Sequence, residues 1–475
     1  MTSGTDSRRL KALTLSLSIA TAMTATAAQA APEDQQTIEA LRAQLQQMQQ
    51  RLDRLEQQQA AGTSGGQQEV ANQGGEKSNT ATTPDPQQSE PRPQQNLAQE
   101  NSSAIEQMQQ TKFSGQLQFN GSFNDWSEQS KDTTGDLDFG KFVLAVNGEV
   151  DDLEYDIEYR FYDGYQFLKS GWLGFNPNDD DTIRVGLVQT PFGNMDYGYQ
   201  GWYGTLPYLA GFNDNQNAGI KWDHHQGPWD ISLAFFKSDN LGSGNEHYGA
   251  NAVGGTDDAV YDDDGALTSR GNQGNSEENQ LALRSGYTFN HGEDYSTQLN
   301  VSAKGGQLYN EQTNRSGDNW SAAIGVDGSY GNWRTMFQAT TYEYNPKNPS
   351  EAQSGISDNA IQIGAFGFNY LIPKRGQMYT ASASYSMDVD WGPVENLFFF
   401  NDFSYIDPSD DFASINGGFG DQDDPMLNDL GVLVTAGPYF AWFDIITNKN
   451  GLNYFGSPVN DKWHTSVQTN FGINF

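Results

Sequence analysis

Apolar and polar side chains alternate along the end of the chain, from Trp463 to Phe475. One set consists of Trp463, Thr465, Val467, Thr469, Phe471, Ile473 and Phe475, and the other of His464, Ser466, Gln468, Asn470, Gly472 and Asn474. Successive side chains of a β-strand point to opposite sides of its sheet, so this period predicts a strand with one apolar and one polar face. At a soluble sheet edge so aromatic a face would aggregate. The pattern therefore favours a strand that lies between lipid and water.

The same alternation recurs from Phe113 onwards. Examples are Phe142, Leu144 and Val146; Tyr155, Ile157, Tyr159 and Phe161; Ile183, Val185 and Leu187; Trp229, Ile231, Leu233 and Phe235; and Tyr439, Ala441, Phe443 and Ile445. Each run with its flanks extends to about ten residues, the length that a tilted strand needs to cross a bilayer. We therefore predict an all-β fold over residues 113–475, a transmembrane antiparallel β-barrel of about 16 strands.

The strand count carries an unresolved conflict. Roughly seventeen candidate strands can be marked, whereas a bacterial barrel with both ends in the periplasm needs an even number. Counted from Phe113, the long connection before Ser357 is extracellular; counted back from Phe475, the long connection near Asp421 is extracellular. The two counts differ by one strand, so one candidate strand is either false or missing.

Composition narrows the class of protein. The chain holds 26 Lys and Arg against 61 Asp and Glu, a formal net charge of -35, which argues against nucleic acid or an anionic membrane surface as a partner. Aromatic residues make up 12% of the chain although its mean hydropathy is -0.70, as expected where half of each strand stays in water. The absence of cysteine suits an oxidising compartment.

The first residues are typical of an export signal. Arg8, Arg9 and Lys11 precede an apolar run, and Ala28-Gln29-Ala30 fits the small-x-small cleavage rule. We expect residues 1–30 to be a signal peptide; a twin-arginine signal is the less favoured interpretation of Arg8-Arg9. Residues 61–112 are rich in Gly, Ser, Gln and Pro and predict a flexible linker.

Between these two parts, residues 31–60 show heptad spacing. The apolar positions, three and four residues apart, are Ile38, Leu41, Leu45, Met48, Leu52 and Leu55. This narrow stripe predicts a periplasmic coiled-coil helix that associates the chains; the alternative is a single amphipathic helix packed on its own barrel.

A stretch in the first half of the barrel resembles a known family. Residues Thr182 to Leu187 (TIRVGL) lead into Thr190-Pro191-Phe192-Gly193, which resembles the phosphate-selective porin O/P family, where an R-V-G strand runs into P-F-G. The resemblance implies a sixteen-stranded trimeric porin. The preceding heptads look like the periplasmic coiled coil of dicarboxylate-type trimeric porins, which implies organic acids as further substrates.

The residues after the P-F-G turn predict a pore-narrowing loop. Residues 194–217 hold many aromatic side chains among Gly and Asp: Tyr197, Tyr199, Trp202, Tyr203 and Tyr208. Counted from the N-terminus this is the third extracellular loop, the one that folds into the lumen of porins. An ordinary aromatic surface loop is the alternative.

Some charged side chains alternate with apolar ones along the predicted strands, and this alternation assigns them to the face that lines the lumen. The basic set is Arg160, Arg184, Arg284, Lys304 and Arg334, and the acidic set is Glu154, Asp156 and Glu158. A water-filled lumen tolerates charge that lipid does not, so this placement by itself needs no special function. The alternative is that the basic set favours anions.

These features together predict an outer-membrane porin of a Gram-negative bacterium that passes small hydrophilic solutes, with phosphate or organic acids among them. A structural or adhesive barrel tethered by the coiled coil is the alternative. Expected partners are two further copies in a homotrimer, outer-membrane lipid, small solutes and, through the terminal Phe475, the barrel assembly machinery. We expect no cofactor, no metal and no catalysis, because the sequence lacks catalytic and metal-binding motifs and its five His are scattered.

Overall fold

The computed structural model describes residues 111–150, 152–195, 197–239, 250, 258–262, 267–365, 368–410, 424–452 and 456–475. The predicted signal peptide and coiled coil lie outside these residues, and so does the predicted linker except for residues 111 and 112, of which Lys112 already belongs to the first strand. Within the described part, no helix is long and apolar enough to cross a membrane.

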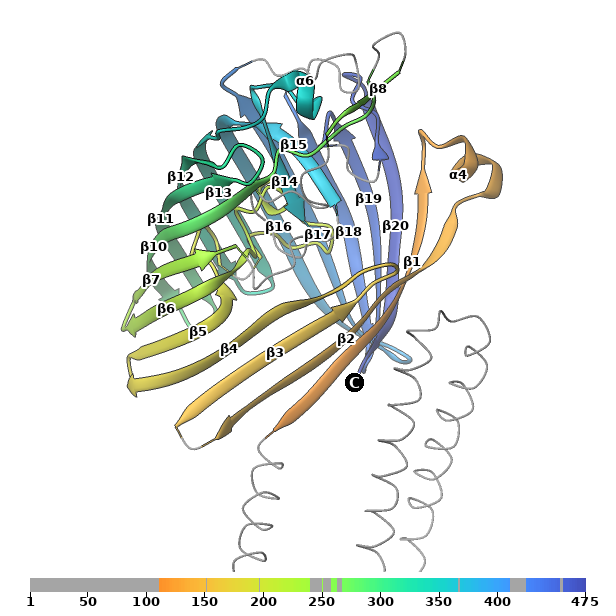
Figure 1. Cartoon of the computed structure of the whole chain (residues 1–475). Helices are drawn as coiled ribbons and strands as arrows, with labels where there is room; N and C mark the ends of the chain where they lie inside the picture. The colour runs from red at the N-terminus through yellow and green to blue at the C-terminus, as the bar shows by residue number, and fades with distance from the viewer. Residues whose placement is uncertain are drawn as a thin grey trace, which may run out of the picture. The chain divides into compact units, whose positions relative to one another are not determined.

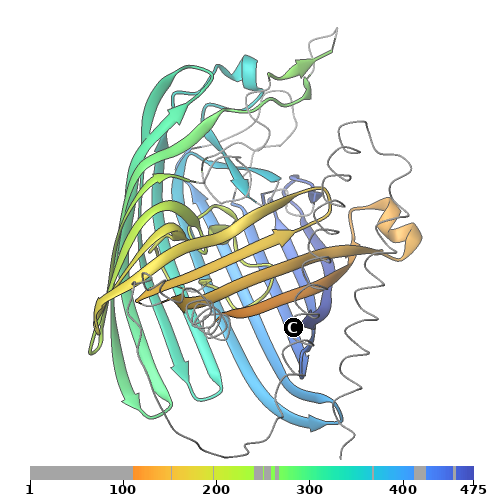
Figure 2. The ribbon, with the colours of Figure 1, turned by 60° about the horizontal axis from the view of Figure 1, so that its bottom comes forward.

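Sixteen strands among the described residues close into one barrel, in which each strand pairs antiparallel with its neighbours along the chain (Figures 1 and 2). They are β1 (Lys112–Asn124), β2 (Asp136–Val150), β3 (Leu153–Phe161), β4 (Gln166–Asn178), β5 (Asp181–Gln189), β6 (Gln216–Gln226), β7 (Trp229–Ser238), β10 (Asn275–Gly292), β11 (Tyr295–Asn310), β12 (Arg315–Tyr330), β13 (Trp333–Asn345), β16 (Arg375–Trp391), β17 (Val394–Pro408), β18 (Met426–Ala436), β19 (Tyr439–Lys449) and β20 (Trp463–Asn474). The predicted all-β antiparallel barrel of about 16 strands is confirmed, and the strand number is sixteen.

The last strand closes the barrel on the first. Strand β20 pairs with β1 from Gln116 opposite Asn474 to Asn124 opposite Ser466. Beyond this ladder, the backbone of Phe475 exchanges two hydrogen bonds with that of Gly115, at 2.8 and 3.0 Å. Both ends of the barrel sequence therefore lie at the same end of the barrel.

Tight turns connect strands at that end. Seven connections consist of two residues each: 151–152, 179–180, 227–228, 293–294, 331–332, 392–393 and 437–438. Three of them read Gly-Pro, at Gly227, Gly392 and Gly437, and each glycine has a positive φ (59°, 66° and 56°). A positive φ followed by the fixed negative φ of proline is the type II′ turn, whose twist matches that of antiparallel strands.

The long connections gather at the opposite end, where α6 and β8 are labelled in Figure 1. They carry the short elements α4 (Glu128–Thr133), α5 (Leu206–Leu209), α6 (Glu351–Ser354), the hairpin of β8 (Val260–Tyr261) with β9 (Leu267–Ser269), and the hairpin of β14 (Ala360–Ala365) with β15 (Phe368–Pro373).

The structure resolves the conflict between the strand counts made from the two ends of the barrel sequence. The connections 346–374 and 409–425 are separated by β16 and β17, an even number of strands, so both lie at the long-loop end. Strands β14 and β15 pair only with each other and stay outside the barrel ladder. Their alternating residues are indistinguishable by pattern from a wall strand, which explains the surplus candidate.

The two faces of the wall differ as the alternation predicts. Along β10, Leu281 and Leu283 are 59% and 50% exposed, whereas Ala282 and Arg284 between and beside them are 2% and 1% exposed. Similar exposed apolar side chains follow the outer face of β11 to β13, such as Val301, Ile324 and Phe337. A band of this kind is unfavourable in water and fits a lipid environment.

Candidate functional site: a narrowed lumen with a basic cavity

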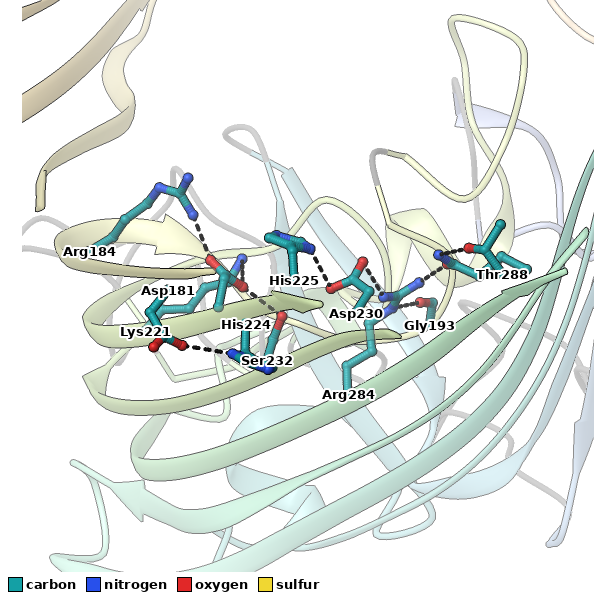
Figure 3. Close-up of polar contacts among 12 residues, drawn as sticks. Asp181, Arg184, Gly193, Lys221, His224, His225, Asp230, Ser232, Arg284 and Thr288 are labelled. Carbon is teal, nitrogen blue, oxygen red and sulfur yellow. Dashed lines mark hydrogen bonds and ion pairs between the residues drawn. The ribbon is translucent and has the colours of Figure 1, made fainter. Parts of the chain in front are cut away.

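The segment between β5 and β6, residues 190–215, folds into the barrel; we call it the inward segment (Figures 1 and 2). It begins against the wall strands β10, β11 and β13. The amide of Gly193 donates to Ser302 Oγ at 2.8 Å, and the amide of Asn194 donates to Gln338 Oε1 at 2.9 Å. Arg284 Nε donates to the Gly193 carbonyl at 2.8 Å, as Figure 3 shows.

The middle of the inward segment reaches β17. The amides of Gln200 and Gly201 donate to the carboxylate of Asp402, at 3.0 and 2.5 Å, and the amide of Leu206 donates to Ser404 Oγ at 2.9 Å. A Cβ on Gly201 would lie 2.4 Å from the ring of Phe400, so only glycine permits this close approach. The segment thus touches walls that are far apart in sequence.

The segment returns along β11 and β4. Lys304 Nζ donates to the Gly211 carbonyl at 3.2 Å. Lys169 Nζ forms a buried ion pair with Asp214 Oδ2 at 2.8 Å. The lumen is therefore crossed by a segment that is held on several sides, the arrangement expected of a constriction.

An apolar cluster fills the lumen between the inward segment, the β14–β15 hairpin and the wall. Its members include Phe192, Leu206, Leu209 and Phe212 of the inward segment, Ile361, Ile363 and Ile372 of the hairpin, and Leu308, Tyr342, Met378, Ile406, Leu427 and Ile446 of the wall. Each fully buried Leu, Ile or Phe side chain contributes about 1.5–3 kcal/mol relative to an exposed one, so the cluster is a strong support for the segment. This part of the lumen is occupied by protein.

A cavity of about 470 Å³ remains beside β3 to β6. Its charged lining residues are Arg160, Lys169, Arg184, Lys221, Arg334, Glu158 and Asp214, and its aromatic ones are Trp172 and Tyr197. Basic side chains therefore outnumber acidic ones among the residues of the wall and the inward segment that line this space.

Three of the cavity's cations have an acid of their own. Besides Lys169 with Asp214, Arg160 Nε lies 2.5 Å from Glu158 Oε1. Arg334 contacts both carboxylate oxygens of Asp327, at 3.0 and 2.7 Å. These pairs leave little net charge at their own positions.

The other two cations share one carboxylate. Arg184 NH1 lies 2.5 Å from Asp223 Oδ2, and Lys221 Nζ lies 3.3 Å from Asp223 Oδ1. Ser232 Oγ also donates to Oδ1, at 2.6 Å. Figure 3 shows Arg184, Lys221 and Ser232, which come from the neighbouring strands β5, β6 and β7. This cluster has an excess positive charge.

The predicted lumen residues divide into three groups. Arg160, Arg184, Arg334 and Glu158 line the cavity, whereas Arg284 and Lys304 are buried and bond backbone carbonyls of the inward segment. Glu154 and Asp156 lie on the same inner face outside the cavity lining, where Glu154 accepts from Asn176 (2.6 Å) and Asp156 from Ser170 (3.2 Å).

Two cavity cations were absent from the sequence prediction. Lys221 sits between Ile220 and Trp222, so the parity rule could have found it. Lys169 was harder to find, because the register of β3 and β4 shifts between Glu158 and Tyr159 and breaks the simple alternation.

The predicted aromatic residues of the inward segment have different surroundings. Tyr197 is 51% exposed and lines the cavity. Trp202 lies beneath Lys141 Nζ at 4.0 Å, and the Tyr203 hydroxyl donates to Gln468 Oε1 at 3.3 Å. Tyr208 packs on the ring of Tyr199, with centroids 4.7 Å apart.

Burial raises the pKa of both Tyr199 and Tyr203 well above the usual value. Both hydroxyls therefore stay neutral and keep their protons for hydrogen bonding. Only Tyr197, among the five predicted aromatics, borders the cavity.

The six predicted trimerisation residues, Ile38 to Leu55, lie outside the described residues. Phe475, the predicted assembly signal, stacks on Phe142 of β2 with ring centroids 6.2 Å apart.

Comparison with known proteins relates the chain to solved barrels by fold alone. No family model matches the sequence, and no curated protein does. The channel DcaP of Acinetobacter baumannii has 10% identity and a TM-score of 0.47, with coverage of 77% of this chain and 97% of that one. OmpF of Salmonella typhi has 11% identity and a TM-score of 0.47, with the same coverage. An anion-selective porin from Comamonas acidovorans has 12% identity, covers 77% of this chain and 99% of its own, and has a TM-score of 0.43.

Proposed function

We propose that the chain forms an outer-membrane porin of a Gram-negative bacterium, through which small hydrophilic solutes diffuse passively. Support for the location comes from the wall, whose outer face is apolar along β10 to β13 and whose inner face is polar or covered by the inward segment. A closed barrel leaves no unpaired sheet edge, so it satisfies its backbone hydrogen bonds within lipid.

We further propose that small anions, such as phosphate or organic acids, pass at least as easily as cations of equal size. The observation that carries this proposal is the excess of basic over acidic side chains among the residues that line the cavity. Charges inside a narrow, partly desolvated lumen act at short range and low dielectric. The many acids of the connecting loops lie near bulk water, where physiological salt screens them beyond about 8 Å.

Two further parts of the proposal concern assembly. The chain forms a homotrimer, with the heptads of residues 31–60 as a periplasmic coiled coil that holds the subunits together. The terminal aromatic Phe475 serves as the signal read by the barrel assembly machinery. Its place on the closing strand, bonded to the first strand, suits a role in recognising a complete barrel.

Single-channel recording in planar bilayers tests the proposed channel, and reversal potentials in a salt gradient test its selectivity. We expect a preference for chloride over potassium that falls when Arg184 or Arg334 is replaced by Gln. Arg315→Gln is the matched control, because Arg315 is an exposed residue at the start of β12. A conductance series with phosphate, dicarboxylates and sugars then ranks the solutes.

Two results contradict the proposal at different levels. A strong cation preference that the Gln variants leave unchanged would show that the acidic side chains determine the electric field in the lumen. Absence of any conductance would favour the alternative of a structural or adhesive barrel, whose lumen is closed.

A further inference from the structure

At the Arg184 end of the cavity, two cations share one direct ion-pair partner. Arg184 and Lys221 share the single carboxylate of Asp223, and the side chains of Lys221 and Asp223 are only 8% and 5% exposed. Two further acids act on the cluster: Asp230, which contacts Arg284 at 3.3 Å, also attracts Lys221, and Asp156 attracts Arg184. Low exposure weakens solvent screening, so Arg184 and Lys221 act strongly at short range on an anion in the cavity.

The guanidinium of Arg184 has donors left for such an anion. A guanidinium carries five N–H groups in a planar fork, and among the described residues that of Arg184 makes one hydrogen bond, to Asp223. The side chain is 28% exposed and borders the cavity. A carboxylate matches the remaining fork because it accepts two parallel N–H bonds.

Two aromatic side chains border the cavity that holds this carboxylate site. The Cζ atom of Arg184 lies over the ring of Trp172, 4.9 Å from its centroid, and Trp172 and Tyr197 both border the cavity. A carboxylate bound to the fork in bidentate fashion lies in the plane of the guanidinium. A ring conjugated with that carboxylate shares the plane, so it extends as a flat surface beside Trp172 and Tyr197, where stacking is favourable.

Size and charge restrict the ligand further. A volume of about 470 Å³ lies within the roughly 300–1,000 Å³ of small-molecule sites and admits a single ring. The other cavity cations, Arg160, Lys169 and Arg334, are each paired with an acid. The remaining donors of the Arg184 fork offer one bidentate place, which matches one carboxylate rather than two.

We infer that the cavity is a binding site for planar aromatic monocarboxylates, of which benzoate is the simplest, and that these acids are solutes of the pore. The inference rests on the proposed channel function for passage but not for binding. Arg184 and Lys221 hold the carboxylate, and Trp172 and Tyr197 select the flat ring.

Equilibrium binding to the full-length protein in detergent tests the site independently of conduction. The two probes are benzoate and cyclohexanecarboxylate, which have the same charge and nearly the same size but differ in the flat π face. Isothermal titration is expected to show benzoate binding about three- to tenfold more tightly, the range that aromatic stacking provides.

Matched variants separate the ring from the charge. Trp172→Leu is expected to remove the preference for benzoate while both acids still bind. Arg184→Lys keeps the charge but loses the planar fork, so it is expected to weaken both acids. Trp320→Leu on the outer face, where Trp320 is 44% exposed, is the control for loss of an indole and is expected to change neither affinity.

The same pair of acids is then compared as inhibitors of the chloride current in planar bilayers, where benzoate is expected to act at the lower concentration. Equal affinities of the two acids, or a benzoate preference that survives in Trp172→Leu, would overturn the inference and leave an anion-selective channel intact. Preferential binding of benzoate by a protein that conducts nothing would refute the channel and keep the site.

Discussion

The buried ion pair between Lys169 and Asp214 is expected to hold the returning end of the inward segment. Lys169 lies on β4 and Asp214 in the segment, their side chains are 6% and 8% exposed, and Nζ also donates to the Asp214 carbonyl at 3.2 Å. Replacing Lys169 by Met keeps the length of the side chain and removes the charge. The carboxylate of Asp214 then remains buried without its cation.

The expected effect is large for a single side chain. Removing one partner of a buried ion pair costs about 3–5 kcal/mol, because the other charge stays desolvated. Since about 1.4 kcal/mol corresponds to a factor of ten, the detached state of this end becomes about a hundred- to several thousandfold more populated. The double variant Lys169→Met with Asp214→Asn removes both charges and is expected to recover most of the loss. Asn also tolerates the positive φ of 52° at position 214.

Hydrogen exchange measures this local opening directly. The amide of Thr190 donates to the Asn215 carbonyl at 2.8 Å and therefore reports on the returning end. We expect its exchange to accelerate in Lys169→Met and to slow again in the double variant, while amides in β18 stay unchanged. Single-channel records of Lys169→Met should show excursions to a larger conductance. If exchange at Thr190 is the same in the single variant and the wild type, the pair does not hold the segment and the reasoning is wrong.

Three further predictions follow from other parts of the chain. Burial, assisted by Glu277, raises the pKa of Asp239 just beyond β7 to about 8. Protonated Asp239 therefore stabilises this region below about pH 4, and this stability is lost as the pH rises through about 8. Protection of the Glu277 amide against hydrogen exchange should fall over that pH window in the wild type. It should not fall in Asp239→Asn. Deleting Phe475 should reduce the amount of heat-modifiable barrel in the outer membrane more than it alters conductance, and normal abundance would contradict this. A chain beginning at Phe113 should give a trimer that dissociates at lower temperature on detergent gels than a trimer of the chain beginning at Ala31. Equal stability of the two trimers would contradict a role of the heptads in holding the subunits together.

The period of two residues was enough to predict the wall. An outward Leu281 and an inward Arg284 are separated by parity alone, because a strand turns alternate side chains to opposite faces wherever it lies. The same argument predicted the inner face for Arg160, Arg184 and Arg334. The closing strand was equally predictable, because the last strand of a closed barrel pairs with the first.

Parity did not show what each inward side chain touches. Arg284 bonds the Gly193 carbonyl and Arg184 faces the cavity, although both carry the same local signature. The difference depends on where the inward segment lies, which contacts such as Asn194 with Gln338 decide across much of the barrel. A local pattern holds no information about such distant partners.

The strand count and the charge balance of the cavity also depended partly on local pattern and partly on tertiary contacts. The alternating residues of β14 and β15 satisfy the pattern of a wall strand, but their partners are each other, because the hairpin packs Ile361 and Ile372 into the cluster inside the lumen. The sequence by itself determined an amphipathic β-barrel, because burial against lipid or water imposes a period of two residues on every strand. Only the tertiary structure decided that Arg184 and Lys221 share Asp223, because pairing between side chains depends on strand register and on a segment that crosses the lumen.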